Sequence, residues 1–280
     1  MAIRDVLVQV DGSRSAPGRF AAAIGVAQTH AANLIGLCLA VEPPVPATIL
    51  GVVPPDLLAT QHDAVRKQAD GAAAQFRHAV EQAGLHGECR SAQVLNVEAI
   101  DVFVQHTRHA DLVILSQSDP EEVSILGSGF PAAIVMGGGR PAIVIPYIGP
   151  GTTLGRRVLV AWDGGREATR AVHDALPILE RADSVTVLSI NPDASRNGGR
   201  RDPGADISLH LARHGVKTTA AWTIANEISV GDAILADIAD NGIDLLVMGA
   251  YGHSRLREVV LGGATRHLLE HMTVPVLMSH

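Results

Sequence analysis

The sequence predicts an α/β protein with two doubly wound parallel sheets, one in each half of the chain, and three observations support this prediction. The chain has 280 residues, enough for two domains of ordinary size. One series of short motifs occurs twice, in the same order. Within each half, strand-like and helix-like patterns alternate, as in parallel sheets covered by helices. We predict domains at residues 1–147 and 156–280, joined by the linker YIGPGTTLG at residues 147–155.

The repeat consists of three pairs of matching segments. They are VLVQVDGSR (6–14) with VLVAWDGGR (158–166), ADLVIL (110–115) with IDLLVMG (243–249), and RPAIVIP (140–146) with VPVLMSH (274–280). The first pair aligns without a gap and places Asp11 opposite Asp163. The N-terminal half is longer between its first and second segments. We therefore expect an insertion there, with PPVPATILGVVPPDLL (43–58) as its main part.

Each half begins with a buried strand and a helix that covers it. Residues 3–10 and 157–162 are short, Val-rich apolar runs, typical of parallel strands buried on both faces. Each following helix has one apolar face at i, i+3, i+4, i+7 spacing. These faces are Phe20, Ala23, Ile24 and Ala27 in the first half and Ala168, Ala171, Val172 and Ala175 in the second.

The remaining elements continue the alternation. Second strands are predicted at 34–40 and 184–190, third strands at 88–94 and 218–224, fourth strands at 110–115 and 243–249, and closing strands at 143–146 and 276–279. A helix is expected before each later strand, and Asn241-Gly242 is a typical helix stop. This order predicts right-handed crossovers, with helices on both faces of each sheet.

Composition excludes several classes of protein. With 47% hydrophobic residues, the chain can form cores, so wholesale disorder is excluded. No apolar run is long enough for a membrane span and the N-terminus lacks a signal-peptide layout, so we expect a cytoplasmic protein. A net charge of −7 without a long basic run argues against nucleic-acid binding, and RNGGRR (196–201) is assigned no function. We expect Cys38 and Cys89 to be free and buried.

The segment GAYGHSRLREVVLGGATR (249–266) is the strongest candidate binding loop. It follows the apolar run 245–248, and both Asp163 and Gly249 lie at predicted carboxyl ends of strands, where α/β sheets bind ligands. Glycine lets backbone approach a phosphate closely, and a helix expected from about Ala264 would attract an anion to its N-terminus. The alternative is two tight turns with no ligand. No GxxxxGK[ST] motif occurs, which excludes a P-loop enzyme.

These motifs resemble the universal stress protein family. The strand-VDGS-helix start, the ADLVIL and IDLLVMG segments, the G-x2-G-x9-G loop and the closing PVL strand are similar to that family's pattern over nearly the whole chain. The chain looks like a tandem member with two fused domains. The resemblance implies a Rossmann-like, adenine-nucleotide-hydrolase-like fold, two halves paired about a pseudo-two-fold axis through their closing strands, and a stress-responsive regulatory role.

Members of the family that bind ATP use the first-strand Asp near the adenine, the glycines around the ribose and phosphates, and a final Gly-Ser or Gly-Thr at the phosphates. The resemblance therefore implies an ATP site, with magnesium as an optional companion, in the C-terminal half. Its residues would be Ala161, Trp162, Asp163, Met248, Gly249, Gly252, His253, Arg255, Gly262, Gly263, Ala264 and Thr265.

Three positions depart from the family pattern or leave their role open. Gly263 stands where Ser or Thr is usual, which removes a hydroxyl but keeps a backbone N–H; a neutral hydrogen bond contributes about 1 kcal/mol net. Thr265 could supply the hydroxyl, or be an ordinary residue of the first helical turn. Trp162 could stack on an adenine or block it.

The N-terminal half departs further. Ser116 and Asp119 replace the first two glycines, and Asp119, Glu121 and Glu122 would repel phosphates. We predict that this half does not bind a nucleotide, although it keeps Asp11 and the Gly127-Ser128 pair.

Two pairs among the 13 histidines have i, i+4 spacing, His210 with His214 and His267 with His271. Neither has a nearby acidic or cysteine third ligand in the sequence, so no metal site is predicted. Catalytic motifs are also missing from the sequence, and the prediction is a non-enzyme. A nucleotide-free interaction module and a slow ATPase are the alternatives.

The insertion carries a compact apolar set: Ile49, Leu50, Val52, Val53, Leu57 and Leu58. Either it folds over its own domain, or it forms a contact surface for a second subunit or another protein partner.

Overall fold

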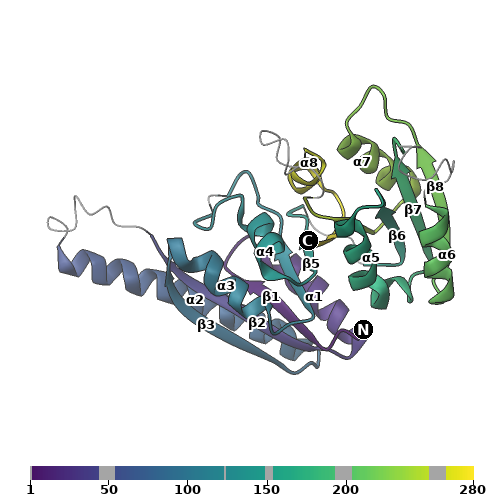
Figure 1. Cartoon of the computed structure of the whole chain (residues 1–280). Coiled ribbons are helices and arrows are strands. Elements are labelled where there is room, and N and C mark those ends of the chain that lie inside the picture. The colour runs from purple at the N-terminus through teal and green to yellow at the C-terminus, as the bar shows by residue number, and fades with distance from the viewer. Residues whose placement is uncertain (1, 44–53, 123, 149–153, 193–203, 252–262) are drawn as a thin grey trace. The chain divides into compact units, whose positions relative to one another are not determined.

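The computed structural model describes residues 2–43, 54–122, 124–148, 154–192, 204–251 and 263–280. Two compact units are present, Ile3–Gly138 and Gly139–His280 (Figure 1). The predicted domain bounds of 1–147 and 156–280 stay a prediction. Within the described residues, no helix is long and apolar enough to cross a membrane.

The N-terminal unit is a parallel sheet of strand order β3-β2-β1-β4 with helices between the strands. Its elements are β1 (Asp5–Val10), α1 (Ala16–His30), β2 (Asn33–Glu42), α2 (Pro55–Gln82), β3 (Gly87–Leu95), a 3₁₀ turn (Asn96–Glu98), α3 (Ala99–Thr107), β4 (Leu112–Ser116) and α4 (Phe130–Gly138). Strand β1 is central: Val6 pairs with Leu34 on one side and with Leu112 on the other.

The C-terminal unit repeats this plan with strand order β5-β10-β9-β6-β7-β8. Its elements are β5 (Ala142–Ile145), β6 (Arg157–Ala161), α5 (Arg166–Leu179), β7 (Ser184–Ile190), α6 (Ala205–Arg213), β8 (Thr218–Thr223), α7 (Val230–Asn241), β9 (Leu245–Gly249), α8 (Gly263–His271) and β10 (Val276–Ser279). Neighbouring strands of this unit run parallel except β5 and β10, which pair antiparallel. The α/β fold with a large, mostly parallel sheet is therefore confirmed.

The two closing strands meet within the C-terminal unit. Val144 on β5 pairs with Val276 on β10, and every residue of both strands is buried. The pairing of the two halves about a pseudo-two-fold axis stays a prediction.

The apolar faces that cover the sheets follow the predicted spacing with one difference. All four predicted residues of α5, from Ala168 to Ala175, are buried. On α1, Ile24 is half-buried, and the buried face includes Val26 and Arg19. The charged residue Arg19 therefore lies on the buried face of α1, which was predicted from the spacing of apolar residues alone.

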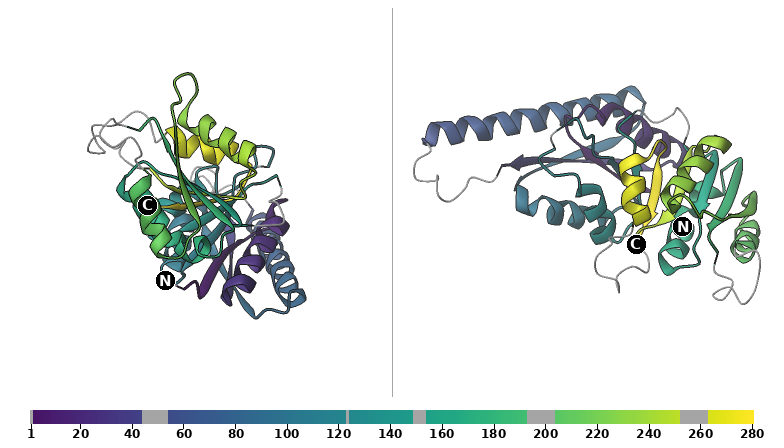
Figure 2. Two further views of the ribbon diagram at one scale, coloured as in Figure 1. Left: turned by 90° about the vertical axis from the view of Figure 1, so that its right-hand side faces the viewer. Right: turned by 90° about the horizontal axis from the view of Figure 1, so that it is seen from above.

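Helix α2 is the longest element, and its two ends differ in environment (Figure 2). Its C-terminal part packs on β2 and β3 through Ala69, Ala73 and Phe76, which are buried. The part before it is largely exposed, and Leu57 is 58% exposed. The predicted insertion thus ends inside a helix, since residues 55–58 form its first turn. Residues 44–53, and with them most of the apolar set, lie outside the described residues, as does RNGGRR.

The cysteines differ in burial. Both are free, but only Cys38 is buried, whereas Cys89 is partly exposed. The expectation of a buried Cys89 is wrong because β3 lies at the end of the strand order, where one long side of the strand has no neighbouring strand among the described residues.

Candidate functional site

A cavity of about 320 Å³ lies in the C-terminal unit, where β6 and β9 end and α8 begins. Its walls are apolar toward Leu188, Ile190 and Ile234, and polar toward Asp163 and Glu167. The place agrees with the rule that α/β sheets bind ligands beyond the carboxyl ends of their strands.

The cavity brings together the predicted site residues that the structure describes. Three stretches of chain contribute them: Ala161, Trp162, Asp163, Met248, Gly249, Gly263, Ala264 and Thr265. The other four predicted residues, Gly252, His253, Arg255 and Gly262, lie outside the described residues. Glu167 and the apolar wall residues were not predicted, because no motif singles them out.

The electrostatics of the cavity combine two carboxylates with one helix terminus. Asp163 is exposed and its Oδ1 accepts the Gly165 N–H at 2.7 Å. Glu167 is only 8% exposed, and Arg166 pairs with it at 3.1 Å. Among the described residues that line the cavity there is no Lys, Arg or His. The positive end of the α8 dipole is therefore the feature there that favours an anion.

Thr265 links the glycine loop to α8. It is the third residue of this helix, is buried, and its Oγ1 accepts the Tyr251 N–H at 3.3 Å. A hydroxyl that accepts one bond can still donate its own hydrogen. Tyr251 has a φ of 55°, an unusual value for a bulky side chain. The positive φ of Tyr251 was not predicted from the sequence, because this backbone conformation is normally expected at glycine.

The two described glycines of the loop have different structural roles. A Cβ on Gly249 would come within 3.0 Å of backbone atoms of Glu167 and Ala168, so this glycine lets α5 start close to β9. A Cβ on Gly263 would meet nothing within 4 Å. Packing therefore explains Gly249 without any ligand, whereas it leaves Gly263 unexplained.

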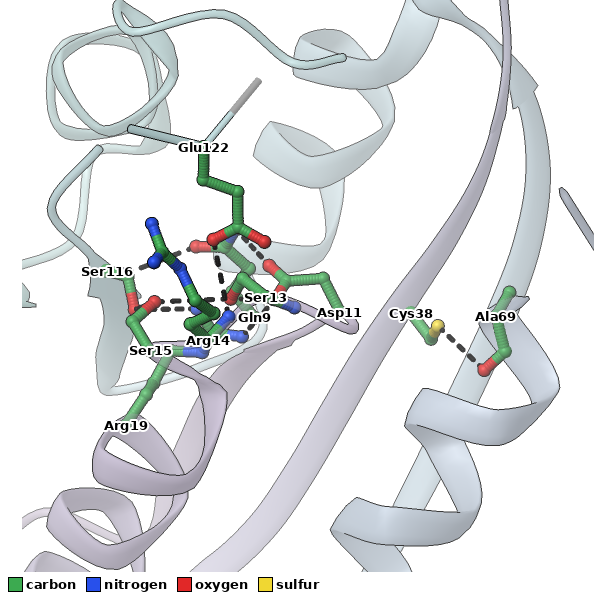
Figure 3. A network of polar contacts seen from close by, with 10 residues as sticks. All are labelled: Gln9, Asp11, Ser13, Arg14, Ser15, Arg19, Cys38, Ala69, Ser116 and Glu122. Atoms are coloured by element: carbon green, nitrogen blue, oxygen red, sulfur yellow. Dashed lines mark hydrogen bonds and ion pairs between the residues drawn. The ribbon is translucent and has the colours of Figure 1, made fainter. Parts of the chain in front are cut away.

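The N-terminal unit has a cavity of about 310 Å³ at the equivalent ends of β1 and β4, but its chemistry differs. The guanidinium of Arg19, fully buried, reaches it from α1 (Figure 3). Arg19 Nη2 pairs with Asp11 Oδ1 at 2.7 Å, and Nη1 donates to Ser116 Oγ at 2.6 Å. Gln9 Nε2 also donates to Asp11 Oδ2 at 2.7 Å. The first-strand Asp of this half is therefore engaged by the protein's own side chains.

The pKa of Asp11 reflects this network. Burial acts to raise it, but the Arg19 charge and hydrogen bonds from Ser13 and Arg19 outweigh burial, and the pKa lies below its ordinary value. Asp11 is thus held as a carboxylate.

The gapless alignment of the two halves shows which side chains differ at equivalent positions. Arg19 stands opposite Ala171, and the fourth-strand alignment puts Ser116 opposite Gly249. Side chains thus occupy the N-terminal half where the C-terminal half has a methyl group or none. Apolar spacing alone did not predict this role of Arg19.

The acidic residues of the N-terminal loop lie at the rim of its cavity. Asp119 and Glu122 line it, and Arg14, 61% exposed, pairs with Asp119 at 2.9 Å. Glu121 is also within 3.6 Å of Arg14. Three carboxylates near one exposed cation leave this rim unfavourable for a phosphate.

Comparisons with known proteins agree with the fold. Residues 155–280 match the model of the universal stress protein family. A universal stress protein of Synechocystis sp. is 41% identical over 80 residues, which is 28% of this chain and 28% of that protein. A crystal structure of a universal stress protein from Archaeoglobus fulgidus covers 98% of this chain and 97% of its own, with a TM-score of 0.74 at 14% identity. A putative universal stress protein from Pseudomonas aeruginosa covers 99% of this chain and 93% of its own, with a TM-score of 0.55 at 15% identity.

Proposed function

We propose that this chain, whose residues 155–280 belong to the universal stress protein family, binds ATP in its C-terminal half and acts in stress responses as a regulator. One observation carries the proposal. Residues from three separate stretches, selected for their resemblance to a nucleotide site, line a single cavity at the ends of β6 and β9.

The cavity offers complementary surfaces for the parts of the nucleotide. Trp162, Leu188 and Ile190 supply apolar contacts for a base. The carboxylates of Asp163 and Glu167 can accept hydrogen bonds from the adenine amino group or the ribose hydroxyls. Phosphates would lie at the start of α8, near the Gly263 backbone and Thr265, where the helix dipole favours negative charge. A magnesium ion bound with the phosphates would offset the two nearby carboxylates.

The N-terminal half, in this proposal, does not bind a nucleotide. Arg19 engages Asp11 and Ser116, and the acidic residues Asp119 and Glu122 line the space where phosphates would lie. A nucleotide would have to displace a buried ion pair and approach uncompensated carboxylates. One ATP per chain is the expected stoichiometry.

The test is a calorimetric titration of nucleotide-free protein with magnesium and ATP, with the release of phosphate measured in parallel. The test variant is Gly263→Glu, which puts a carboxylate at the start of α8 in open space. The matched control is Gly129→Glu, directly before α4 in the N-terminal half, where a Cβ also meets nothing within 4 Å.

One saturable site that is lost in Gly263→Glu, kept in Gly129→Glu and without phosphate release supports the proposal. The absence of binding up to millimolar ATP would favour a nucleotide-free interaction module. Magnesium-dependent phosphate release that is lost in Gly263→Glu would instead identify an ATPase.

A further inference from the structure

Three histidine rings form a cluster on the helices α5 and α6, apart from the nucleotide cavity. His210 on α6 contacts His173 on α5, with ring centroids 5.2 Å apart, and His214, with centroids 4.8 Å apart. The sequence supplied only the pair His210 and His214 at helical spacing, without a third ligand. The fold supplies the third histidine from a helix more than thirty positions earlier.

The central ring carries an unsatisfied polar atom. His210 Nε2 is buried and, within the described part of the chain, has no hydrogen-bond partner. A buried nitrogen without a partner is costly, and a bound metal ion is one way to satisfy it. Burial, followed by the nearby His214, His173 and Arg213, lowers the pKa of His210.

The outer rings are compatible with the same role. His173 Nδ1 donates to the Thr169 carbonyl at 2.8 Å, since a carbonyl can only accept. This bond leaves the lone pair on Nε2, and histidine ligands commonly donate their other N–H to a carbonyl in this way. His173 and His214 are both exposed, so a metal ion can reach the cluster from solvent.

The ring spacing fits shared coordination. Two imidazoles on one ion, with metal–nitrogen distances of about 2.0–2.1 Å, have centroids roughly 4.5–5.5 Å apart. The two centroid distances around His210 fall in this range. Among the described residues, no group of three or more His, Cys, Asp or Glu side chains is already placed to hold a metal ion, so the three rings would have to turn about their Cβ–Cγ bonds to converge on one.

From the orphaned Nε2 of His210 and its contacts with two further imidazoles, we propose that His173, His210 and His214 bind a divalent transition-metal ion such as Zn²⁺. Three neutral nitrogens and a water would complete a tetrahedral site. Arg213 is a nearby cation and lowers the affinity that this set would otherwise reach. The ion would join α5 to α6 and stabilise the C-terminal unit.

The test is calorimetric titration of the full, tag-free chain with Zn²⁺, together with the visible spectrum of bound Co²⁺. We expect one ion per chain and a tetrahedral Co²⁺ spectrum, with affinity falling at least tenfold in His210→Gln and in His214→Gln. His214 is exposed, so its variant keeps the test valid if His210→Gln fails to fold. The matched control is His271→Gln in the pair His267 and His271, whose rings stack at 4.4 Å but which lacks a third histidine contact in the described residues.

Three results would overturn the proposal: no binding at millimolar Zn²⁺, binding unchanged in both His210→Gln and His214→Gln, or an equal loss in the His271→Gln control. The readout is independent of ATP, so failure of the nucleotide proposal would leave this test unaffected.

Discussion

Arg19 distinguishes the two halves at the scale of single residues. It is fully buried and paired with Asp11, whose counterpart Asp163 is exposed and free of a buried cation among the described residues. Removal of one member of a buried ion pair leaves a charge without compensation. The pair therefore contributes to the stability of the N-terminal unit.

We predict that Arg19→Met lowers the free energy of unfolding by about 1.5–3 kcal/mol, the range for hydrogen bonds to charged groups, because Asp11 is 31% exposed and its carboxylate keeps contact with solvent. Urea denaturation measures this change. Arg14→Met is the control, because Arg14 is 61% exposed and its pair with Asp119 should contribute at most about 1 kcal/mol. Asp11→Asn should restore part of the loss in the double variant. Equal effects of the two arginine variants would show that Arg19 is not a buried partner of Asp11.

The same pair predicts a dependence on pH. The pKa of Asp11 in the folded protein lies below the ordinary value of 3.8, so the folded state binds fewer protons than the unfolded state. Its contribution to stability is present above about pH 4 and is lost as the pH falls through the folded pKa. Urea titrations at a series of pH values should show a smaller acid-induced loss in Asp11→Asn. A parallel loss in both proteins would contradict the lowered pKa.

We predict that Gly263→Ser binds ATP more tightly than the unaltered protein does. A side chain at this position meets open space, and serine would restore the hydroxyl that the family resemblance leads one to expect. One added hydrogen bond of about 1 kcal/mol corresponds to roughly fivefold tighter binding of ATP. Calorimetry compares Gly263→Ser with the unaltered protein. Unchanged or weaker binding would place the phosphates away from the start of α8.

At the scale of elements, the contact of α5 with β9 depends on Gly249. We predict that Gly249→Ala destabilises the protein by about 1–3 kcal/mol, since its Cβ would meet the backbone of Glu167 and Ala168. Gly25→Ala is the control: it lies in α1, a Cβ there meets nothing, and alanine should stabilise by about 0.5–1 kcal/mol. Thermal unfolding of the two variants measures both changes in stability. A neutral Gly249→Ala would mean that α5 can shift away from β9.

Most elements could be predicted from local patterns. The strands β7 and β10 begin and end where the apolar runs do, and α7 ends at Asn241, followed by Gly242 with a φ of 56°. These features depend on residues close together in the chain. The exposed first half of α2 and the partly exposed Cys89 could not be predicted, because both depend on where the sheet ends.

Residues of the candidate site could be predicted from the sequence where they belong to a repeated motif, and not elsewhere. Asp163 and Gly249 follow from repeated motifs, but Glu167 lines the cavity only because α5 begins beside β9. Arg19 interrupts an otherwise apolar face, and its role depends on Asp11 and Ser116, which the fold brings to it. His173 likewise reaches His210 only through the packing of two helices.

At the scale of the whole molecule, the chain carries one plan twice with different chemistry at equivalent places. The N-terminal cavity is crossed by a polar network of the protein's own side chains, whereas the C-terminal cavity has small residues at the matching positions. We therefore propose that the C-terminal half binds the ligand and that the N-terminal half is a stable, ligand-free counterpart.

The most direct measurement of this central claim uses Trp162, which lines the C-terminal cavity. The only other tryptophan, Trp222, is 53% exposed on β8, so Trp222→Phe leaves a single reporter in the chain. We predict a saturable change in Trp162 fluorescence as ATP and magnesium are added, and its loss on addition of the Gly263→Glu change. Fluorescence that stays constant up to millimolar ATP, in a protein whose calorimetry is also silent, would contradict nucleotide binding by this half.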